Sequence, residues 1–482
     1  MADQNGAPSQ KDVLGRSRIF TPEVVNDIHI KAELGRYRMR GFSIFKPIPH
    51  WDELVFLPGT LTRFVIEGYR EKCDTTTVLG ARFAKNPLKL DIPIYITGMS
   101  FGALSLEAKM ALAKGASMAG TATCSGEGGM IPPERDYSTK WYYQCIQSRY
   151  GFNPHHLMLA DACEFFIGQG CKVGLGGHLM GQKVTEQVAE MRSLPAGIDQ
   201  RSPARHPDWL GPDDLSLKVQ EIREATDYRI PIQLKLGASR VYDDVRMAAK
   251  CGPDIIYLDG AEGGTGAGPH IATEETGIPL MAAIPEARRA LEDVGLADEI
   301  DLVVAGGIRN GADVAKAIAL GAKAVAIGHS ALMALNCNKE IPGVTDYEGT
   351  VGVPAGQCYH CHTGRCPVGV ATQDPELRKR LVVEDASERV YNFLTAMTME
   401  LQMLARACGK TNVHSLEPED LAALTVEASA MARVPLAGTT YTVGQTEREI
   451  LAEVQRLLAI KAEDELAANP TAQVTDLHSV ES

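Results

Sequence analysis

Short apolar runs that end in glycine, serine or a polar residue alternate with alanine-rich segments between residues 91 and 335. The runs are continuously apolar instead of alternating, which is typical of parallel strands buried on both faces. Eight strands with their crossovers in about 240 residues match the size of a (β/α)8 barrel. The runs that we expect to be strands are Ile92–Gly98, Thr121–Gly126, Tyr142–Ile146, Glu164–Gln169, Ile232–Gly237, Ile255–Gly260, Leu302–Gly307 and Ala324–Gly328.

Helical periodicity fills several of the segments between these runs. The first predicted helix extends from Ser105 to Ala119, with Ser105 as its N-cap and Leu106, Met110 and Ala113 on one face. An open doubly wound sheet is the alternative. No Gly-x-Gly-x-x-Gly motif follows the first strand, so a dinucleotide-binding fold has little support. The sequence therefore predicts an α/β protein built on a TIM barrel.

Three further regions flank this predicted barrel. Residues 1–90 are expected to form an irregular N-terminal layer packed on the barrel, residues 336–375 a cysteine-bearing loop, and residues 376–482 a helical C-terminal extension. The first 15 or so residues and the tail after Ala467 are polar, as chain ends often are. Helices are expected over Pro375–Thr411 and Leu416–Ala432, and Thr446-Glu-Arg-Glu449 is a capping-box pattern that opens another.

Composition narrows the classes of function. The chain has 482 residues, of which 45% are hydrophobic and 23% charged, as in ordinary globular proteins. A formal net charge of −13 argues against nucleic acid or an anionic membrane as the main partner. The sequence has neither an 18-residue apolar stretch nor the apolar core of a signal peptide. Eleven cysteines, an odd number, fit thiols and metal ligands in a reducing compartment, so we expect a cytoplasmic protein.

A cysteine cluster lies after the last predicted strand. Cys358, Cys361 and Cys366 are spaced C-x2-C-x4-C and the last precedes a proline, a pattern that brings three thiolates together as an iron–sulfur cluster requires. Zinc is an alternative, because His360 and His362 could complete a tetrahedral site with two cysteines. A loop of packed thiols without a metal is the third possibility.

The C-terminal ends of barrel strands usually carry the active site. Gly306 and Gly307 end the seventh run and Gly328 and His329 the eighth, so bare backbone amides could approach a phosphate there. Tight strand-to-helix turns are the plainer explanation for these glycines. Lys235 lies inside the apolar fifth run, where an unpaired charge is costly. It could stabilise the negative charge of a reduced flavin ring, or simply form a salt bridge inside the barrel.

Other polar groups follow the earlier strands. The small residues of Met99-Ser-Phe-Gly-Ala103 would let a planar cofactor lie against the main chain, and Glu127 offers a carboxylate in a glycine-rich loop. Lys172 and Arg192 together could hold a dicarboxylate, because arginine binds carboxylates bidentately, and Gln169 adds an amide beside them. Taken singly, such charges are more often solvated surface groups.

Six of these motifs, in order, resemble those of the FMN and iron–sulfur region of glutamate synthase, over about residues 91–375. The motifs are Met99-Ser-Phe-Gly-Ala-Leu-Ser105, Ser125-Gly-Glu-Gly-Gly129, Gln169-Gly-Cys-Lys172, Gly263-Gly-Thr-Gly266, Ala305-Gly-Gly-Ile-Arg309 and Cys366-Pro-Val-Gly-Val-Ala-Thr-Gln373. Within this family the chain looks most like the stand-alone flavin subunit of N-methylglutamate synthase-type enzymes. Glu71-Lys-Cys-Asp, Arg205-His-Pro-Asp208 and Glu417-Pro-Glu-Asp-Leu421 contribute to that likeness.

The resemblance implies FMN in the barrel, 2-oxoglutarate as the oxo acid, and hydride transfer from reduced FMN to an imine of 2-oxoglutarate. Glu127, Gln169, Lys172 and Arg192 would then surround the oxo acid. The residues that would hold FMN are Met99, Ser100, Phe101, Gly102, Ala103, Gln169, Lys235, Gly264, Thr265, Gly306, Gly307, Gly328 and His329.

The chain departs from the family pattern in two ways. Cys337 is the apparent counterpart of the first cluster cysteine, but an insertion carrying Cys358 separates it from Cys361 and Cys366. Three ligands would give a [3Fe-4S] cluster, as the resemblance to the family implies, whereas four would permit [4Fe-4S]. No catalytic cysteine follows Met1 and no amidotransferase-sized domain precedes the barrel, so we expect an amidotransferase-like subunit and other small subunits as partners.

The resemblance leaves three functions to compare. The first is a flavin subunit of a complex that makes N-methyl-L-glutamate from methylamine and L-glutamate. The second is a glutamate synthase subunit that uses glutamine-derived ammonia and external electrons. The third is a scaffold that retained the barrel without its chemistry.

Overall fold

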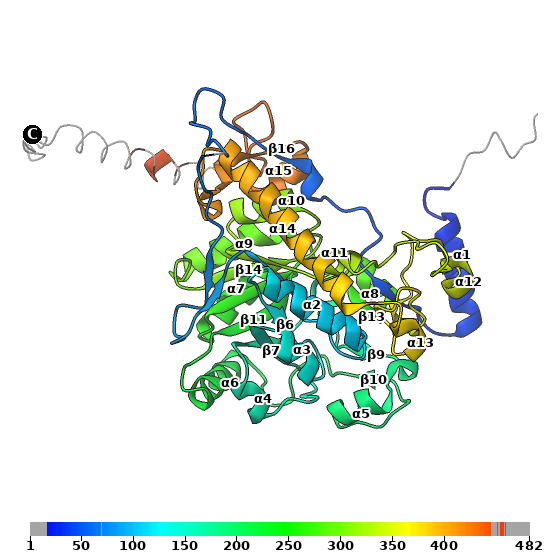
Figure 1. Ribbon diagram of the computed structural model, residues 1–482. Helices are drawn as coiled ribbons and strands as arrows, with labels where there is room; N and C mark the ends of the chain where they lie inside the picture. The colour runs from blue at the N-terminus through cyan, green and yellow to red at the C-terminus, as the bar shows by residue number, and fades with distance from the viewer. Residues whose placement is uncertain (1–16, 69, 445–450, 452–453, 457, 459–482) are drawn as a thin grey trace, which may run out of the picture.

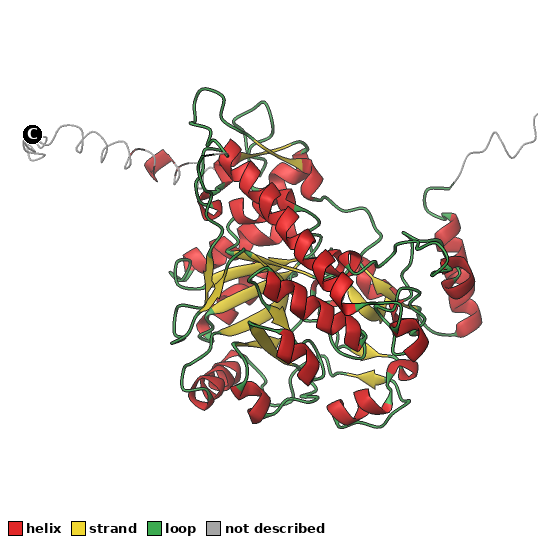
Figure 2. Ribbon diagram, viewed as in Figure 1, coloured by secondary structure: helices red, strands yellow, loops and turns green. Residues whose placement is uncertain are grey.

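Eight parallel strands form a barrel at the centre of the molecule, as the computed structural model shows (Figures 1 and 2). The structure describes residues 17–68, 70–444, 451, 454–456 and 458. The strands are β5 (Ile94–Ile96), β6 (Thr123–Cys124), β7 (Trp141–Cys145), β8 (Ala162–Phe166), β11 (Ile232–Gly237), β12 (Ile255–Asp259), β14 (Asp301–Ala305) and β15 (Ala324–Ile327). They follow the order β5-β15-β14-β12-β11-β8-β7-β6 around the sheet. The amide of Ile96 donates to the carbonyl of Ala122 at 3.0 Å and joins the two ends. The predicted (β/α)8 fold is confirmed.

The barrel interior is packed with side chains, and its N-terminal end is closed. Tyr95, Tyr142 and Tyr257 are fully buried inside it. An antiparallel hairpin of β3 (Thr77–Leu79) and β4 (Leu88–Leu90) packs below them, and its leucines belong to the same buried cluster. The hairpin therefore forms a floor, and the other end of the barrel is left for a binding site.

Helices surround the barrel, and one long helix covers another. Helix α2 (Leu106–Met118) begins where predicted, because the Ser105 hydroxyl accepts a hydrogen bond from the Ala108 amide at 3.2 Å. Of the three residues expected on one face of this helix, Ala113 is buried, whereas Leu106 and Met110 are half-buried. Helix α14 (Val383–Ala407) packs along α2 (Figure 1) and turns other positions of α2 into buried ones.

The remaining helices of the barrel region follow the expected alternation with strands. They are α3 (Pro132–Tyr137), α4 (Pro154–Met158), α5 (Glu186–Arg192), α6 (Pro212–Ala225), α7 (Val241–Lys250), α8 (His270–Glu275), α9 (Leu280–Asp293), α10 (Gly311–Ala319) and α11 (His329–Ala334). A further short helix, α12 (Tyr347–Val351), lies in the cysteine-bearing loop. None of the helices in the described ranges is long and apolar enough to cross a bilayer.

The N-terminal layer is more regular than its sequence suggested. It contains α1 (Pro22–Leu34), β1 (Met39–Phe42) and β2 (Leu54–Phe56) as well as the hairpin. β1 pairs antiparallel with β13 (Thr265–Pro269), a short strand that follows β12 outside the barrel.

The C-terminal extension corrects one prediction. Residues 416–432 do not form a single helix: Leu421–Ala423 is strand β16, which pairs antiparallel with β2, and only α15 (Val426–Ala432) is α-helical. Pairing with β2 is a long-range contact that local periodicity cannot reveal. The predicted helix over Pro375–Thr411 is interrupted between α13 (Pro375–Arg378) and α14. The capping-box pattern at Thr446–Glu449, residues 1–15 and the tail after Ala467 lie outside the described residues.

Candidate functional site

A cavity of about 1030 Å³ opens at the C-terminal ends of the barrel strands, where barrel enzymes place their active sites. The loops after β5, β6, β8, β12, β14 and β15 all contribute to its wall. Most of the predicted site residues line this one cavity. They are Met99, Ser100, Ala103, Glu127, Gln169, Lys172, Lys235, Gly264, Thr265, Gly306, Gly307, Gly328 and His329.

Three of the residues predicted to bind FMN or the oxo acid are not part of the cavity wall. Phe101 is buried in a separate apolar cluster, and Gly102 lies against it. Arg192 is 2% exposed and its guanidinium donates to the carbonyls of Phe101 at 2.9 Å and Glu127 at 3.3 Å. Arg192 therefore supports the two loops that carry Phe101 and Glu127 from behind.

Glycines leave one part of the wall bare. A Cβ on Gly264 would lie 1.6 Å from the His329 ring, so only glycine fits at that position. Gly306 and Gly307 have φ angles of 118° and 67°, which favour glycine. Because β14 and β15 are paired neighbours, Gly306 and Gly307 lie beside Gly328 at the same rim. Such a cradle of exposed main chain fits a phosphate group.

Lys235 projects from β11 into the barrel mouth and is 4% exposed. Its ammonium lies 3.6 Å from an Asp259 carboxylate oxygen, 3.3 Å from the Thr97 hydroxyl and 4.2 Å from the centre of the Tyr257 ring. Burial by itself lowers the pKa of Lys235, but Tyr257 and Asp259 outweigh burial, and the pKa lies above its usual value. Lys235 is therefore a permanent positive charge that is both paired and in contact with the cavity.

Lys172 is a second buried lysine on the same cavity, with fewer partners. Its ammonium donates to the carbonyl of Ala267 at 3.1 Å, and burial lowers its pKa. An ammonium has three donors, so Lys172 can bind an anion as well. Gln169 donates to the carbonyl of Gly264 at 3.2 Å. The Glu127 carboxylate accepts a hydrogen bond from the Ser202 hydroxyl.

Sequence reasoning missed one whole side of the cavity. Residues 42–50, which we call the strap, contribute Phe42, Ser43, Ile44, Lys46, Pro47, Ile48 and His50 to its lining. The prolines at 47 and 49 were the available signal, because they keep the chain extended and out of regular structure. His50 lies close to Gly307 in the glycine cradle.

A second feature that the sequence did not reveal is Glu164, which is held by hydrogen bonds next to the cavity. Gln144 lines the cavity and donates to the carboxylate of Glu164 at 2.5 Å, and Gln233 donates to the other carboxylate oxygen. Glu164 is therefore buried in the barrel interior with hydrogen bonds to both oxygens, as a buried carboxylate requires. In the sequence Glu164 resembled any polar residue at the start of a strand.

The cysteine loop contacts this cavity. Cys361 is part of the cavity wall, and burial raises its pKa to about 12, with a smaller contribution from the neighbouring Cys366. The ammonium of Lys183 donates to the carbonyls of Cys361 at 2.9 Å and Ala103 at 2.7 Å. Lys183 therefore ties the cysteine loop to the loop after β5.

Cys337 lies near the other three cysteines of the loop. Burial raises the pKa of Cys337, and the thiols of Cys361, Cys366 and Cys358 raise it further. The side chain of Asn338 accepts from the Cys358 amide at 2.8 Å and so fixes the insertion beside Cys337. Within the described ranges no three His, Cys, Asp or Glu side chains converge as ligands of one metal ion, which a zinc site requires.

The sequence of residues 66–411 matches the family model described as the conserved region in glutamate synthase. This chain belongs to the glutamate synthase family. The matched region begins before the β3–β4 hairpin, contains the whole barrel and the cysteine loop, and ends after α14. The strap and β1 precede it.

Relatives within the glutamate synthase family cover most of the chain. A glutamate synthase large subunit-like protein of Rhizobium meliloti is 51% identical over 430 residues, which are 89% of this chain and 97% of the relative. An archaeal-type glutamate synthase (NADPH) of Thermotoga maritima is 36% identical over 82% of this chain and 79% of the relative. The glutamate synthase (NADPH) large chain of Bacillus subtilis is 33% identical, and the match covers 24% of that longer protein.

Among solved structures, a mutant flavocytochrome b2 with benzoylformate has a TM-score of 0.47 and 17% identity over 77% of this chain and 76% of that chain. That likeness is too low to argue from, and the barrel is established by its own strand order.

Proposed function

We propose that this chain is the flavin-bearing catalytic subunit of a glutamate synthase-type complex that makes N-methyl-L-glutamate and ammonia from methylamine and L-glutamate. The observation that carries the proposal is one cavity with a glycine cradle on one side and two buried lysines, Lys235 and Lys172, on its wall. The cradle fits the phosphate of FMN, and the lysines fit the ring and the substrate.

The residues present fit FMN. Gly306, Gly307 and Gly328 would expose main chain to its phosphate, and the bare backbone at Gly264 would lie against it. Burial lowers the pKa of His329 to about 4, so its ring is neutral at pH 7 and can act as a hydrogen-bond donor. Bound in this cavity, FMN would supply reversible hydride transfer with the Cα–N bond of glutamate.

The substrate side of the cavity would be formed by Lys172, Gln169 and Glu127. Lys172 has donors left to bind a carboxylate of 2-oxoglutarate or glutamate, and its burial strengthens such an ion pair. Lys235 would keep its positive charge near the flavin ring and favour the reduced, anionic form. Arg192 would act on this pair of loops only through the carbonyls that it binds.

We further propose that Cys361, Cys366, Cys337 and Cys358 hold an iron–sulfur cluster, with [3Fe-4S] favoured and [4Fe-4S] possible. Iron would stabilise the thiolates that burial disfavours in the protein alone. The position of Cys361 in the cavity wall supports a cluster close to the flavin.

The two catalytic candidates differ in the nitrogen compound that they use, which is methylamine in the first and glutamine-derived ammonia in the second. Exchange of ammonia for methylamine needs no net electrons, because the hydride removed from glutamate returns to the N-methyl imine. The relative of nearly equal length, described as large subunit-like, supports a subunit that works with partners. We propose that an amidotransferase-like subunit is one of them. The relatives described as glutamate synthase (NADPH) favour the second candidate, which makes L-glutamate from 2-oxoglutarate and glutamine-derived ammonia.

The purified complex, supplied with methylamine and L-glutamate and no reductant, should form N-methyl-L-glutamate and release an equal amount of ammonia. Isotope-labelled methylamine and mass spectrometry would measure this conversion. Strict dependence on an added reductant would reject the first candidate in favour of the second. A colourless preparation without flavin absorbance would reject both and leave a scaffold.

A further inference from the structure

The strand that follows the Gly263–Gly264 loop is not part of the barrel sheet. Strand β13 pairs with β1 and, in the described part of the chain, with no other strand. Arg40 lies opposite Gly268, and a bulge separates that pair from Phe42 opposite Thr265. The contacts made by β1 therefore help to hold the β1–β13 ribbon over the cavity, together with those that β13 makes with residues 170–172, 178–179 and 361–363.

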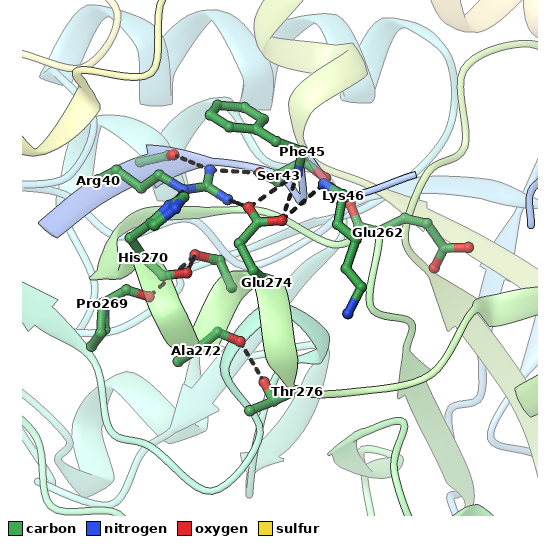
Figure 3. A network of polar contacts seen from close by, with 12 residues as sticks. Arg40, Ser43, Phe45, Lys46, Glu262, Pro269, His270, Ala272, Glu274 and Thr276 are labelled. Carbon is green, nitrogen blue, oxygen red and sulfur yellow. Dashed lines mark hydrogen bonds and ion pairs between the residues drawn. The ribbon is translucent and has the colours of Figure 1, made fainter. Parts of the chain in front are cut away.

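Several of these contacts are made by the side chain of Arg40 (Figure 3). Its side chain is 3% exposed and forms an ion pair with Glu274 of α8. Its Nε donates to the His270 ring at 2.7 Å, and another nitrogen donates to the carbonyl of Ser43 at 2.6 Å. The planar guanidinium lies 4.0 Å from the centre of the Phe45 ring. Arginine alone offers donors in this many fixed directions.

Glu274 extends the same contacts to the strap. Its carboxylate accepts hydrogen bonds from the amides of Phe45 at 3.1 Å and Lys46 at 2.8 Å (Figure 3). The Ser43 hydroxyl donates to the carbonyl of Glu262 in the loop after β12. Because α8 follows β13 directly, Arg40 and Glu274 join β1, the strap and the end of β13 into one unit.

This unit presents its carbonyls to the substrate side of the cavity. The ammonium of Lys172 makes its 3.1 Å hydrogen bond to Ala267, in the middle of β13. Gln169 donates to Gly264, immediately before β13. A Cβ on Gly268, the residue opposite Arg40, would lie 3.6 Å from Cδ of Lys172, so the ribbon also packs along the lysine stem.

We propose that Arg40 is a positioning residue for oxo-acid binding: with Glu274 and His270 it holds β13 in the place that orients Lys172 and Gln169. The proposal rests on the proposed function, because it takes the ligand of those two residues to be 2-oxoglutarate. Arg40 itself does not line the cavity, so it acts through β13 and not on the ligand.

The test is 2-oxoglutarate binding to the flavin-loaded complex, followed by the change in flavin absorbance. Arg40→Met should weaken binding by about tenfold or more, since small displacements of binding groups are costly. In steady-state assays the oxo-acid KM should rise more than kcat falls. Arg40→Lys keeps the positive charge but loses the planar set of donors. Its affinity for 2-oxoglutarate should lie between those of Arg40→Met and the unchanged protein.

Arg38→Met is the matched control. Arg38 lies two residues away, and its guanidinium pairs with Asp27 near the surface. The dissociation constant in this variant should stay within about twofold, because the Arg38–Asp27 pair is partly exposed and, in the described part of the chain, its side chains make no hydrogen bond to β13.

Glu274→Gln guards against a folding failure, because it removes the negative charge of the Arg40–Glu274 ion pair while keeping the shape of the side chain and an acceptor. It should weaken 2-oxoglutarate binding in the same direction with flavin content unchanged. Unaltered binding in Glu274→Gln, or in a folded Arg40→Met, would overturn the inference. If the unchanged protein did not bind 2-oxoglutarate at all, the proposed function would fail instead.

Discussion

Single residues in the barrel mouth combine structural and chemical roles. Lys235 is paired with Asp259 at 3.6 Å, as the salt-bridge interpretation of the sequence required, and it also faces the cavity. The sequence could indicate that a buried lysine needed a partner, but it could not name Asp259, which comes from the neighbouring strand β12. For Arg192 the residue type suggested that it binds the oxo acid. The structure places its side chain behind the loops that carry Phe101 and Glu127.

Lys235→Met should lower the potential of the proposed flavin, because a positive charge that favours the reduced ring is lost. The expected decrease is on the order of 30 mV or more for the two-electron couple, measured by redox titration against a reference dye. Lys85→Met serves as the control, because Lys85 forms only an exposed ion pair with Asp227. An unchanged potential in Lys235→Met would contradict this role of Lys235.

The elements that the sequence predicted best are those whose signal is local. Most residues of the barrel strands are buried and apolar, and Ser105 caps α2 with its own hydroxyl. The missed elements take their structure from distant partners. Strand β16 exists because Leu421–Ala423 pairs with β2. Strand β1 pairs with a glycine-rich segment that has no strand pattern.

Strand β1 lies against the cysteine loop at Gly41, and this contact can be tested. A Cβ on Gly41 would lie 2.8 Å from Cβ of Cys361 and 2.9 Å from the Gly266 carbonyl. Gly41→Ala should therefore displace the cysteine loop, lower iron and sulfide per flavin, and cost about 1–3 kcal/mol of unfolding free energy through overpacking. Iron and sulfide analysis, EPR and urea unfolding would measure these changes.

Gly211→Ala is the control for this substitution, because Gly211 is in extended backbone and a Cβ there meets no atom within 4 Å. Its iron content should match that of the unchanged protein. Equal iron in Gly41→Ala would mean that the cysteine loop does not depend on its contact with β1.

The two ends of the barrel differ in role: one end is packed with apolar side chains, and the other end holds the candidate site. The β3–β4 hairpin fills one end with Leu79, Leu88 and Leu90, while the cavity occupies the other end. The sequence predicted which end would carry the site, because the C-terminal ends of the strands share one rim. It did not reveal the floor or the strap, since both come from the N-terminal layer, where the pattern is short and interrupted.

Leu90→Ala should lower the free energy of unfolding by about 2–5 kcal/mol, because it opens a hole in a fully buried cluster. Flavin content and 2-oxoglutarate affinity should not change, since Leu90 is at the far end of the barrel. Leu210→Ala is the control, because Leu210 is 87% exposed and should shift stability by no more than about 0.5 kcal/mol. Lost flavin in a folded Leu90→Ala protein would argue against the separation of the two ends.

The leucines of the β3–β4 hairpin close one end of the barrel, so the cavity opens at the other end. In the proposed reaction, cofactor, amino acid and amine would all have to enter over this same rim. A compound that caps this rim would stop entry and departure together without resembling any of the reactants.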